Sequence, residues 1–153
     1  MKPIFFFTLF LYATTAVGAC SGENIKHSSL VASVEAIKEG NASLFESYRV
    51  LPQGDSTRLA AGGLFHDVNS LTARGTAVGD LLYLYDGMKS GDNRTLVNKV
   101  LIARAKELAK YVSEDIPAID RYLGHMYSAG VAAQVMPIKA GLKALKNELS
   151  ACL

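Results

Sequence analysis

The chain has 153 residues, of which 16 are lysine or arginine and 14 are aspartate or glutamate, so its formal net charge is +2. Nucleic-acid-binding domains carry strongly clustered basic residues, whereas acidic and basic residues alternate along this chain. The composition therefore argues against a nucleic-acid partner, and the length suits one domain with one hydrophobic core.

The first nineteen residues have the pattern of a secretory signal peptide. Lys2 precedes an uncharged, largely apolar run over residues 4–12, and small residues then follow as far as Ala19. The apolar run is much shorter than the roughly twenty residues that a permanent membrane-spanning helix requires. We expect residues 1–19 to be removed and residues 20–153 to form a single helical domain without a membrane span. The mature protein should then be periplasmic or extracellular.

The two cysteines, Cys20 and Cys152, lie near the two ends of this expected mature chain. Cysteines of exported proteins normally pair, which predicts a disulfide between them. The segment Val17-Gly18-Ala19-Cys20 also resembles a bacterial lipobox. On that alternative Cys20 carries a lipid anchor, and the protein is an envelope lipoprotein with a structural role. Both interpretations need the same sulfur atom, and the sequence leaves both open.

The first helical region of the mature chain extends from Ser29 to Leu51. Its apolar residues recur at helical spacing and are interrupted only at Gly40-Asn41, which predicts one helix with a break or two short helices. The proline, glycine and aspartate within residues 51–55 are typical of a turn. Ser56 or Thr57 is expected to cap the helix that follows.

The strongest helical periodicity in the chain runs from Leu64 to Tyr85 and predicts a helix approaching thirty residues. Glycines at 62, 63 and 75 within it suggest a close approach of a neighbouring helix or a local kink. After a turn at residues 90–93, apolar residues from Leu96 and Val100 to Val112 are expected to face the core.

Two prolines interrupt the second half of the chain. Pro117 predicts a restart or a kink, and Pro137 bends or restarts a final apolar stripe that runs from Tyr127 to Leu149. No alternating β-type run is found. The predicted fold class is all-α, an up-and-down bundle of about four helices, or five with a proline break. An even number of helices would bring Cys20 and Cys152 to the same end.

Motifs for catalysis or metal binding are absent from the sequence. The three histidines, at 27, 66 and 125, show neither the Glu-X-X-His pattern nor the three- or four-residue spacing of ligands on one helix face. We therefore predict no metal, no cofactor and no enzymatic activity. A catalytic alternative would need His66 or His125 to meet an acid in a cleft.

The segment Leu81 to Tyr85 is apolar on all sides of its helix, so part of it should be buried and any exposed part could bind a partner. The candidate partner or ligand patch comprises Leu82, Tyr83, Tyr85, Tyr111 and Tyr127. The leading hypothesis is an exported, non-enzymatic binding protein of the bacterial cell envelope, of an immunity or inhibitor type, whose partner is another protein. The alternative is a carrier of a small apolar ligand, held in a pocket among the same residues apart from Tyr83.

Overall fold

The computed structural model describes residues 19–153, so the predicted signal peptide lies outside the described residues except for Ala19. The described chain is all-α and contains no strand, which confirms the predicted fold class. Its helices are α1 (His27–Tyr48), α2 (Ser56–Gly87), α3 (Asp92–Leu123), α4 (Ala129–Ala133) and α5 (Val135–Glu148), with the short 3-10 helices η1 (Gly22–Asn24) and η2 (Ser150–Cys152).

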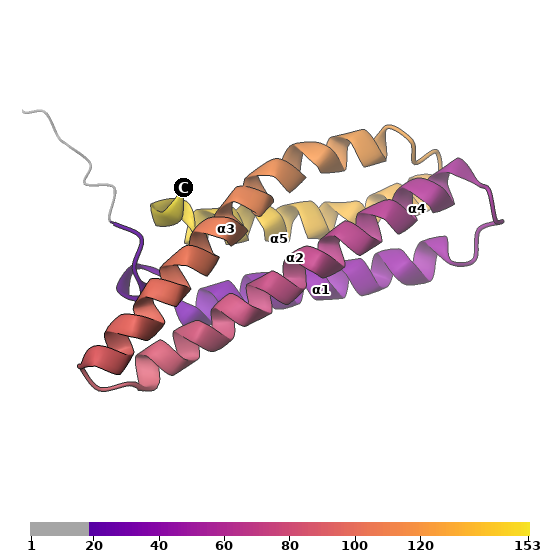
Figure 1. Cartoon of the computed structure of the whole chain (residues 1–153). Helices are drawn as coiled ribbons and strands as arrows, with labels where there is room; N and C mark the ends of the chain where they lie inside the picture. Colours follow the sequence, from indigo (N-terminus) through magenta and orange to yellow (C-terminus); the bar gives the residue numbers. More distant parts are fainter. Residues whose placement is uncertain (1–18) are drawn as a thin grey trace, which may run out of the picture.

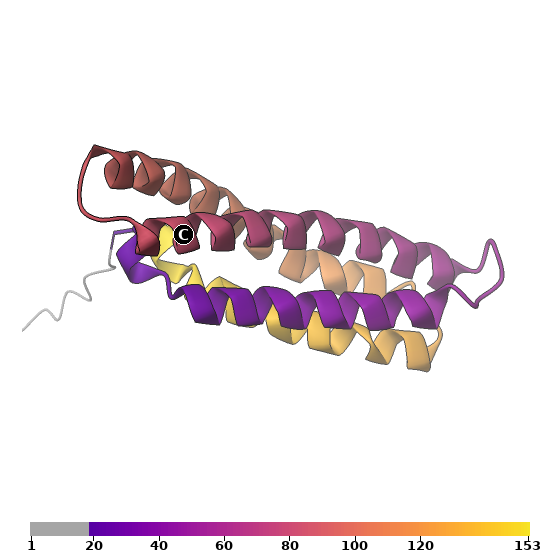
Figure 2. The same cartoon turned by 90° about the horizontal axis from the view of Figure 1, so that it is seen from below.

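The helices α1, α2, α3 and α5 form the up-and-down bundle (Figure 1). Helix α1 packs against α2 and α5, and α3 packs against the same two helices. Because α2 and α3 are each 32 residues long, the hairpin that they form projects beyond the N-terminus of α1 and the C-terminus of α5 in both views (Figures 1 and 2). The η1 and η2 segments lie at this same end of the bundle.

The core consists of aliphatic side chains that recur three or four residues apart on the four main helices. Its largest fully buried members are Leu30, Ile37 and Leu44 on α1, Leu64 and Leu82 on α2, Leu101, Leu108 and Ile119 on α3, and Ile138, Leu142 and Leu145 on α5. Three residues predicted to face this core do not. Leu96, Val100 and Tyr127 are exposed, although Leu101 beside Val100 is fully buried.

The predicted interruption of the first helix at Gly40-Asn41 is wrong, because α1 is continuous. Gly40 lies where α5 crosses α1, and a Cβ atom there would stand 2.9 Å from Cγ1 of Ile138. The buried Asn41 amide donates to the Phe65 carbonyl oxygen at 3.1 Å and to Oδ1 of Asn69 at 2.9 Å. The two residues mark contacts with neighbouring helices, which local sequence patterns do not distinguish from a break.

The cap of α2 also differs from the prediction. Asp55 precedes the helix, and its carboxylate accepts a hydrogen bond from the Arg58 backbone N–H at 3.2 Å. Thr57 is buried instead, and its hydroxyl oxygen accepts hydrogen bonds from the backbone N–H groups of Tyr127 and Ser128. This threonine therefore fixes the connection between α3 and α4 to the first turn of α2.

The two internal prolines behave differently. Helix α3 continues through Pro117 to Leu123, so the predicted restart does not occur. Near Pro137 the chain does break, because α4 ends at Ala133 and α5 begins at Val135. Proline has no N–H to donate to the carbonyl group four residues earlier, and for Pro137 that carbonyl belongs to Ala133. The bundle therefore has the fifth helix that a proline break would produce.

Candidate functional site

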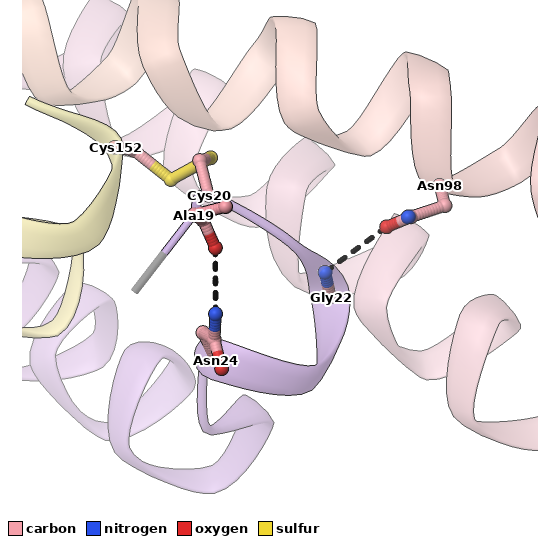
Figure 3. Close-up of a disulfide and its surroundings, with 6 residues drawn as sticks. All are labelled: Ala19, Cys20, Gly22, Asn24, Asn98 and Cys152. Atoms are coloured by element: carbon pink, nitrogen blue, oxygen red, sulfur yellow. Dashed lines mark hydrogen bonds between the residues drawn. A yellow bond between two sulfur atoms is a disulfide. The ribbon is translucent and has the colours of Figure 1, made fainter. Parts of the chain in front are cut away.

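A disulfide between Cys20 and Cys152 joins the two ends of the described chain, with their Cα atoms 4.6 Å apart, as predicted (Figure 3). Beyond it, the backbone N–H of Gly22 donates to Oδ1 of Asn98 on α3 at 3.0 Å, and the Asn24 side-chain amide donates to the Ala19 carbonyl oxygen (Figure 3). The N-terminal segment is thus held against the α2–α3 hairpin. Lipidation of Cys20 would require that the disulfide be absent.

The five residues of the predicted patch have very different environments. Leu82 and Tyr85 are buried in the core. The Tyr85 ring lies under the Arg94 guanidinium, 4.3 Å from it, and Tyr111 is partly buried beneath the guanidinium of Arg74 at 4.2 Å. Tyr83 and Tyr127 are exposed, at 71% and 78%.

The two exposed tyrosines also lie far apart. The backbone of Tyr127 is bonded to Thr57 in the first turn of α2, whereas Tyr83 lies 26 residues after Thr57 on the same helix. At 1.5 Å per residue, this separates them by about 39 Å along the helix. The five residues therefore form neither one surface nor one cavity. Tyr83 and Tyr111 line different hollows, and Tyr83 is the exposed one of the two.

Tyr83 lines a hollow of about 350 Å³ between α1 and α2, which we call the α1–α2 pocket. Its floor is apolar, with Val31 and Val34 from α1 facing Gly75 and Gly79 from α2. At one wall the rings of Tyr83 and His27 lie 6.0 Å apart. The two glycines let α1 approach α2 closely at the floor, since a Cβ atom at Gly75 would lie 2.6 Å from Cγ2 of Val34. The pocket is further lined by Thr76 and by the carboxylates of Glu35 and Asp80.

The charges around this pocket are acidic. Glu35 is ion-paired with the exposed Lys38 at 2.7 Å. Asp80 is exposed, and its carboxylate makes no ion pair or side-chain hydrogen bond with any described residue. An apolar floor, an aromatic wall and a carboxylate rim together suit a cationic group on an aliphatic stem, such as a lysine or arginine side chain.

A second hollow region lies between α2 and α3. It consists of two adjoining cavities of about 260 and 420 Å³, which share Asp67, Glu114 and Asp115. Burial and the neighbouring carboxylates of Asp67 and Glu114 raise the pKa of Asp115 to about 6. The Tyr122 hydroxyl donates to Oδ2 of Asp67 at 2.5 Å, and this hydrogen bond, with burial, raises the pKa of Tyr122 to about 12.

The histidines of the catalytic alternative take different places around this region. His125 lines the larger cavity with Asp67 and Asp115, whereas His66 is exposed and its ring lies beside that of Phe65. Among the described residues no hydrogen bond joins either histidine to an acid, and no group of three His, Cys, Asp or Glu side chains is suited to hold a metal ion. Within the described part of the chain, neither histidine is therefore held in a hydrogen-bonded pair with an acid.

The sequence alone identified Tyr83 but missed the residues that form its pocket. His27 and Val31 lie on α1, and nothing local shows which turn of α1 stands beside Tyr83. The available signal was the pair Gly75 and Gly79, whose four-residue spacing on one helix face allows a neighbouring helix to approach closely.

No family model matches this chain, and neither a curated protein nor a solved structure is similar enough to count as a relative. Among the described helices, none is long and apolar enough to span a membrane.

Proposed function

We propose that the protein is an exported, non-enzymatic binding protein of the bacterial cell envelope that receives a basic side chain of a partner protein in the α1–α2 pocket. The observation that carries this proposal is the exposed ring of Tyr83 beside an apolar hollow with an acidic rim. Tyrosine and arginine are the residues most enriched among those that dominate protein–protein binding energy. An inhibitor or immunity role would use such a pocket.

The pocket chemistry matches the two parts of a basic side chain. The aliphatic stem would lie on Val31, Val34 and the two glycines, and each buried methylene contributes about 0.8 kcal/mol. The cationic head would lie near Asp80, and the ring of Tyr83 would contact the stem or the head. Binding by shape and charge requires no catalytic group.

The disulfide supports the exported location that the proposal assumes. Disulfides persist in oxidising compartments such as the periplasm and the extracellular space, and both cysteines of the chain are used in this bond. A lipid anchor on Cys20 would leave Cys152 without its partner. A soluble binding protein is thus favoured over the lipoprotein alternative.

The proposal can be tested without knowing the partner, by titrating isotope-labelled protein with small probes followed by NMR. The basic probe is N-acetyl-arginine amide, and its matched uncharged probe is N-acetyl-norleucine amide. We expect the basic probe to shift the backbone amides of Val31, Gly75 and Tyr83 with millimolar affinity. Asp80→Asn should weaken this binding several-fold, and Tyr83→Ala should abolish it. Tyr127→Ala, which removes an equally exposed tyrosine elsewhere, is the control and should have no effect.

Two results would count against this proposal. Equal or stronger binding of the norleucine probe would support the apolar-ligand carrier instead. Absence of binding by both probes at these amides would remove the α1–α2 pocket as the functional site.

A further inference from the structure

The outer face of the α2–α3 hairpin carries exposed apolar side chains that the bundle does not cover. Leu96 and Val100 on α3 are 62% and 44% exposed, and Leu84 on α2 is also exposed. Single exposed leucines are ordinary in soluble proteins. Here Leu84 lies in the last turn of α2, and Leu96 and Val100 lie in the first three turns of α3, next to the connection of the hairpin.

Helical geometry places these residues on one face. Nη1 of Arg74 on α2 pairs with Oε1 of Glu107 on α3 at 2.6 Å, which marks the line where the two helices meet. Seven residues are nearly two helical turns, so Val100 lies on the same side of α3 as Glu107. Leu96 is one turn closer to the hairpin tip on that side, and Leu84 is at a similar height on α2.

Along α3 these residues belong to a single row with four-residue spacing: Asp92, Leu96, Val100 and Arg104. We call this row the α3 ridge. It has an acid at one end, a base at the other and two apolar residues between them. Ridges with four-residue spacing are the ones that interdigitate in the commonest class of helix packing.

We propose that a second copy of this chain docks antiparallel on the α3 ridge, with a two-fold axis passing at residue 98. Leu96 of each copy then contacts Val100 of the other, and Asp92 of each copy faces Arg104 of the other. The members of each pair lie at equal distances before and after residue 98, so the two-fold axis brings them together. Such a self-complementary arrangement is what a two-fold dimer requires. No residue of the α3 ridge lines the α1–α2 pocket, so this inference does not depend on the proposed function.

The charges at the two ends of the ridge are exposed, and Arg104 would contact Asp92 of the other copy in addition to Glu107. Asp92 lies in the first turn of α3 and makes no ion pair with another described residue. Arg104 is 60% exposed and is held by Oε2 of Glu107 at 3.0 Å. The ridge is short, so the dimer should be weak and should form in a concentration-dependent way.

The test is sedimentation velocity of the oxidised protein, residues 20–153, between about 10 μM and about 1 mM, a range that covers weak association. The wild-type protein should change from monomer to dimer. Asp92→Arg and Arg104→Asp each place like charges opposite one another twice, and each should weaken the dimer at least about tenfold. Lys143→Asp, an exposed charge reversal on α5, is the control and should leave the dimer unchanged.

Mixing the two single variants provides the decisive result. In a mixed dimer every facing pair again joins an acid and a base, so the Asp92→Arg and Arg104→Asp chains should form a heterodimer although neither forms a homodimer. A misfolded variant would not recover on mixing, and circular dichroism checks that each variant is folded. Leu96→Ser removes the apolar contact without a charge change, and it should also weaken the dimer. A wild type that stays monomeric throughout, a dimer unaffected by these variants, or variants that do not associate when mixed would each overturn the proposal.

Discussion

The contact between α1 and α5 and the contact between α2 and α3 are made in different ways. At the first, small residues allow the backbones to approach, since a Cβ atom at Gly141 would lie 2.6 Å from Cγ1 of Ile37. At the second, long polar side chains bridge the helices. Arg74 pairs with Glu107, and Tyr122 donates to Asp67.

This difference predicts how each contact responds to change. A contact made by close approach is sensitive to added volume and insensitive to pH. A contact bridged by charged groups leaves space between the helices, and the two cavities that share Asp115 lie there. Its strength should depend on pH because Asp115 has a raised pKa.

The largest effect should come from removing the disulfide, because this bond connects the two helix contacts. It joins the segment beside η1, which packs on α2 and α3, to η2, which follows α5. The bond closes a loop over a sequence separation of 132 residues. The paired substitution Cys20→Ser with Cys152→Ser should lower the free energy of unfolding in urea by about 3 to 5 kcal/mol. Hydrogen exchange should accelerate in α1 and α3 alike, and a change confined to one helix pair would refute the shared role.

The next effect should come from volume added where α1 and α5 approach closely. Gly141→Ala should destabilise the protein by about 2 kcal/mol, because the new methyl group meets Ile37 and the α1 backbone. Gly62→Ala is the matched control within α2, where a Cβ atom would make only ordinary contact with Tyr48 at 3.8 Å. That variant should be stabilised by up to about 1 kcal/mol through helix propensity. Equal effects at both glycines would contradict the close approach of α1 and α5.

At the polar contact between α2 and α3, a substitution of Asp115 should raise the free energy of unfolding. Its pKa is raised from 3.8 to about 6 in the folded protein, so the folded state binds this proton more tightly than the unfolded chain. The stability that protonation provides is therefore lost as pH rises from about 4 to about 6. Asp115→Asn should raise the free energy of unfolding at pH 7.5 by about 1 kcal/mol, after allowance for solvent screening of a half-exposed group.

The measurement is urea unfolding of both proteins at pH 5 and at pH 7.5. The gap between variant and wild type should be larger at the higher pH. Glu114→Gln, at an exposed neighbour, serves as the control for simple loss of negative charge. A gap that does not depend on pH would show that Asp115 is not destabilised by its surroundings.

Helical periodicity predicted the fold class, and the presence of two cysteines in an exported chain predicted the disulfide. Periodicity failed at Leu96 and Val100, which are exposed although the neighbouring Leu101 is fully buried, because the spacing of apolar residues does not show which of them meet another helix. Asn41 was misread for a related reason: a polar residue that bonds to another helix looks locally like a break. The pocket at Tyr83 also required the relative heights of α1 and α2, which no local pattern contains.

The smallest expected effect is at the hydrogen bond between Tyr122 and Asp67. Tyr122→Phe removes the hydroxyl and keeps the ring, which packs near Gly63, so the loss should be about 0.5 to 1 kcal/mol for a partly exposed bond. A double-mutant cycle with Asp67→Asn isolates the pair, and the coupling should account for most of that loss. The same cycle between Tyr122 and Glu35, which lie on different contacts, should give no coupling. If the Tyr122–Asp67 coupling were also zero, the polar side chains would fill the α2–α3 contact without stabilising it, and packing alone would hold both helix pairs together.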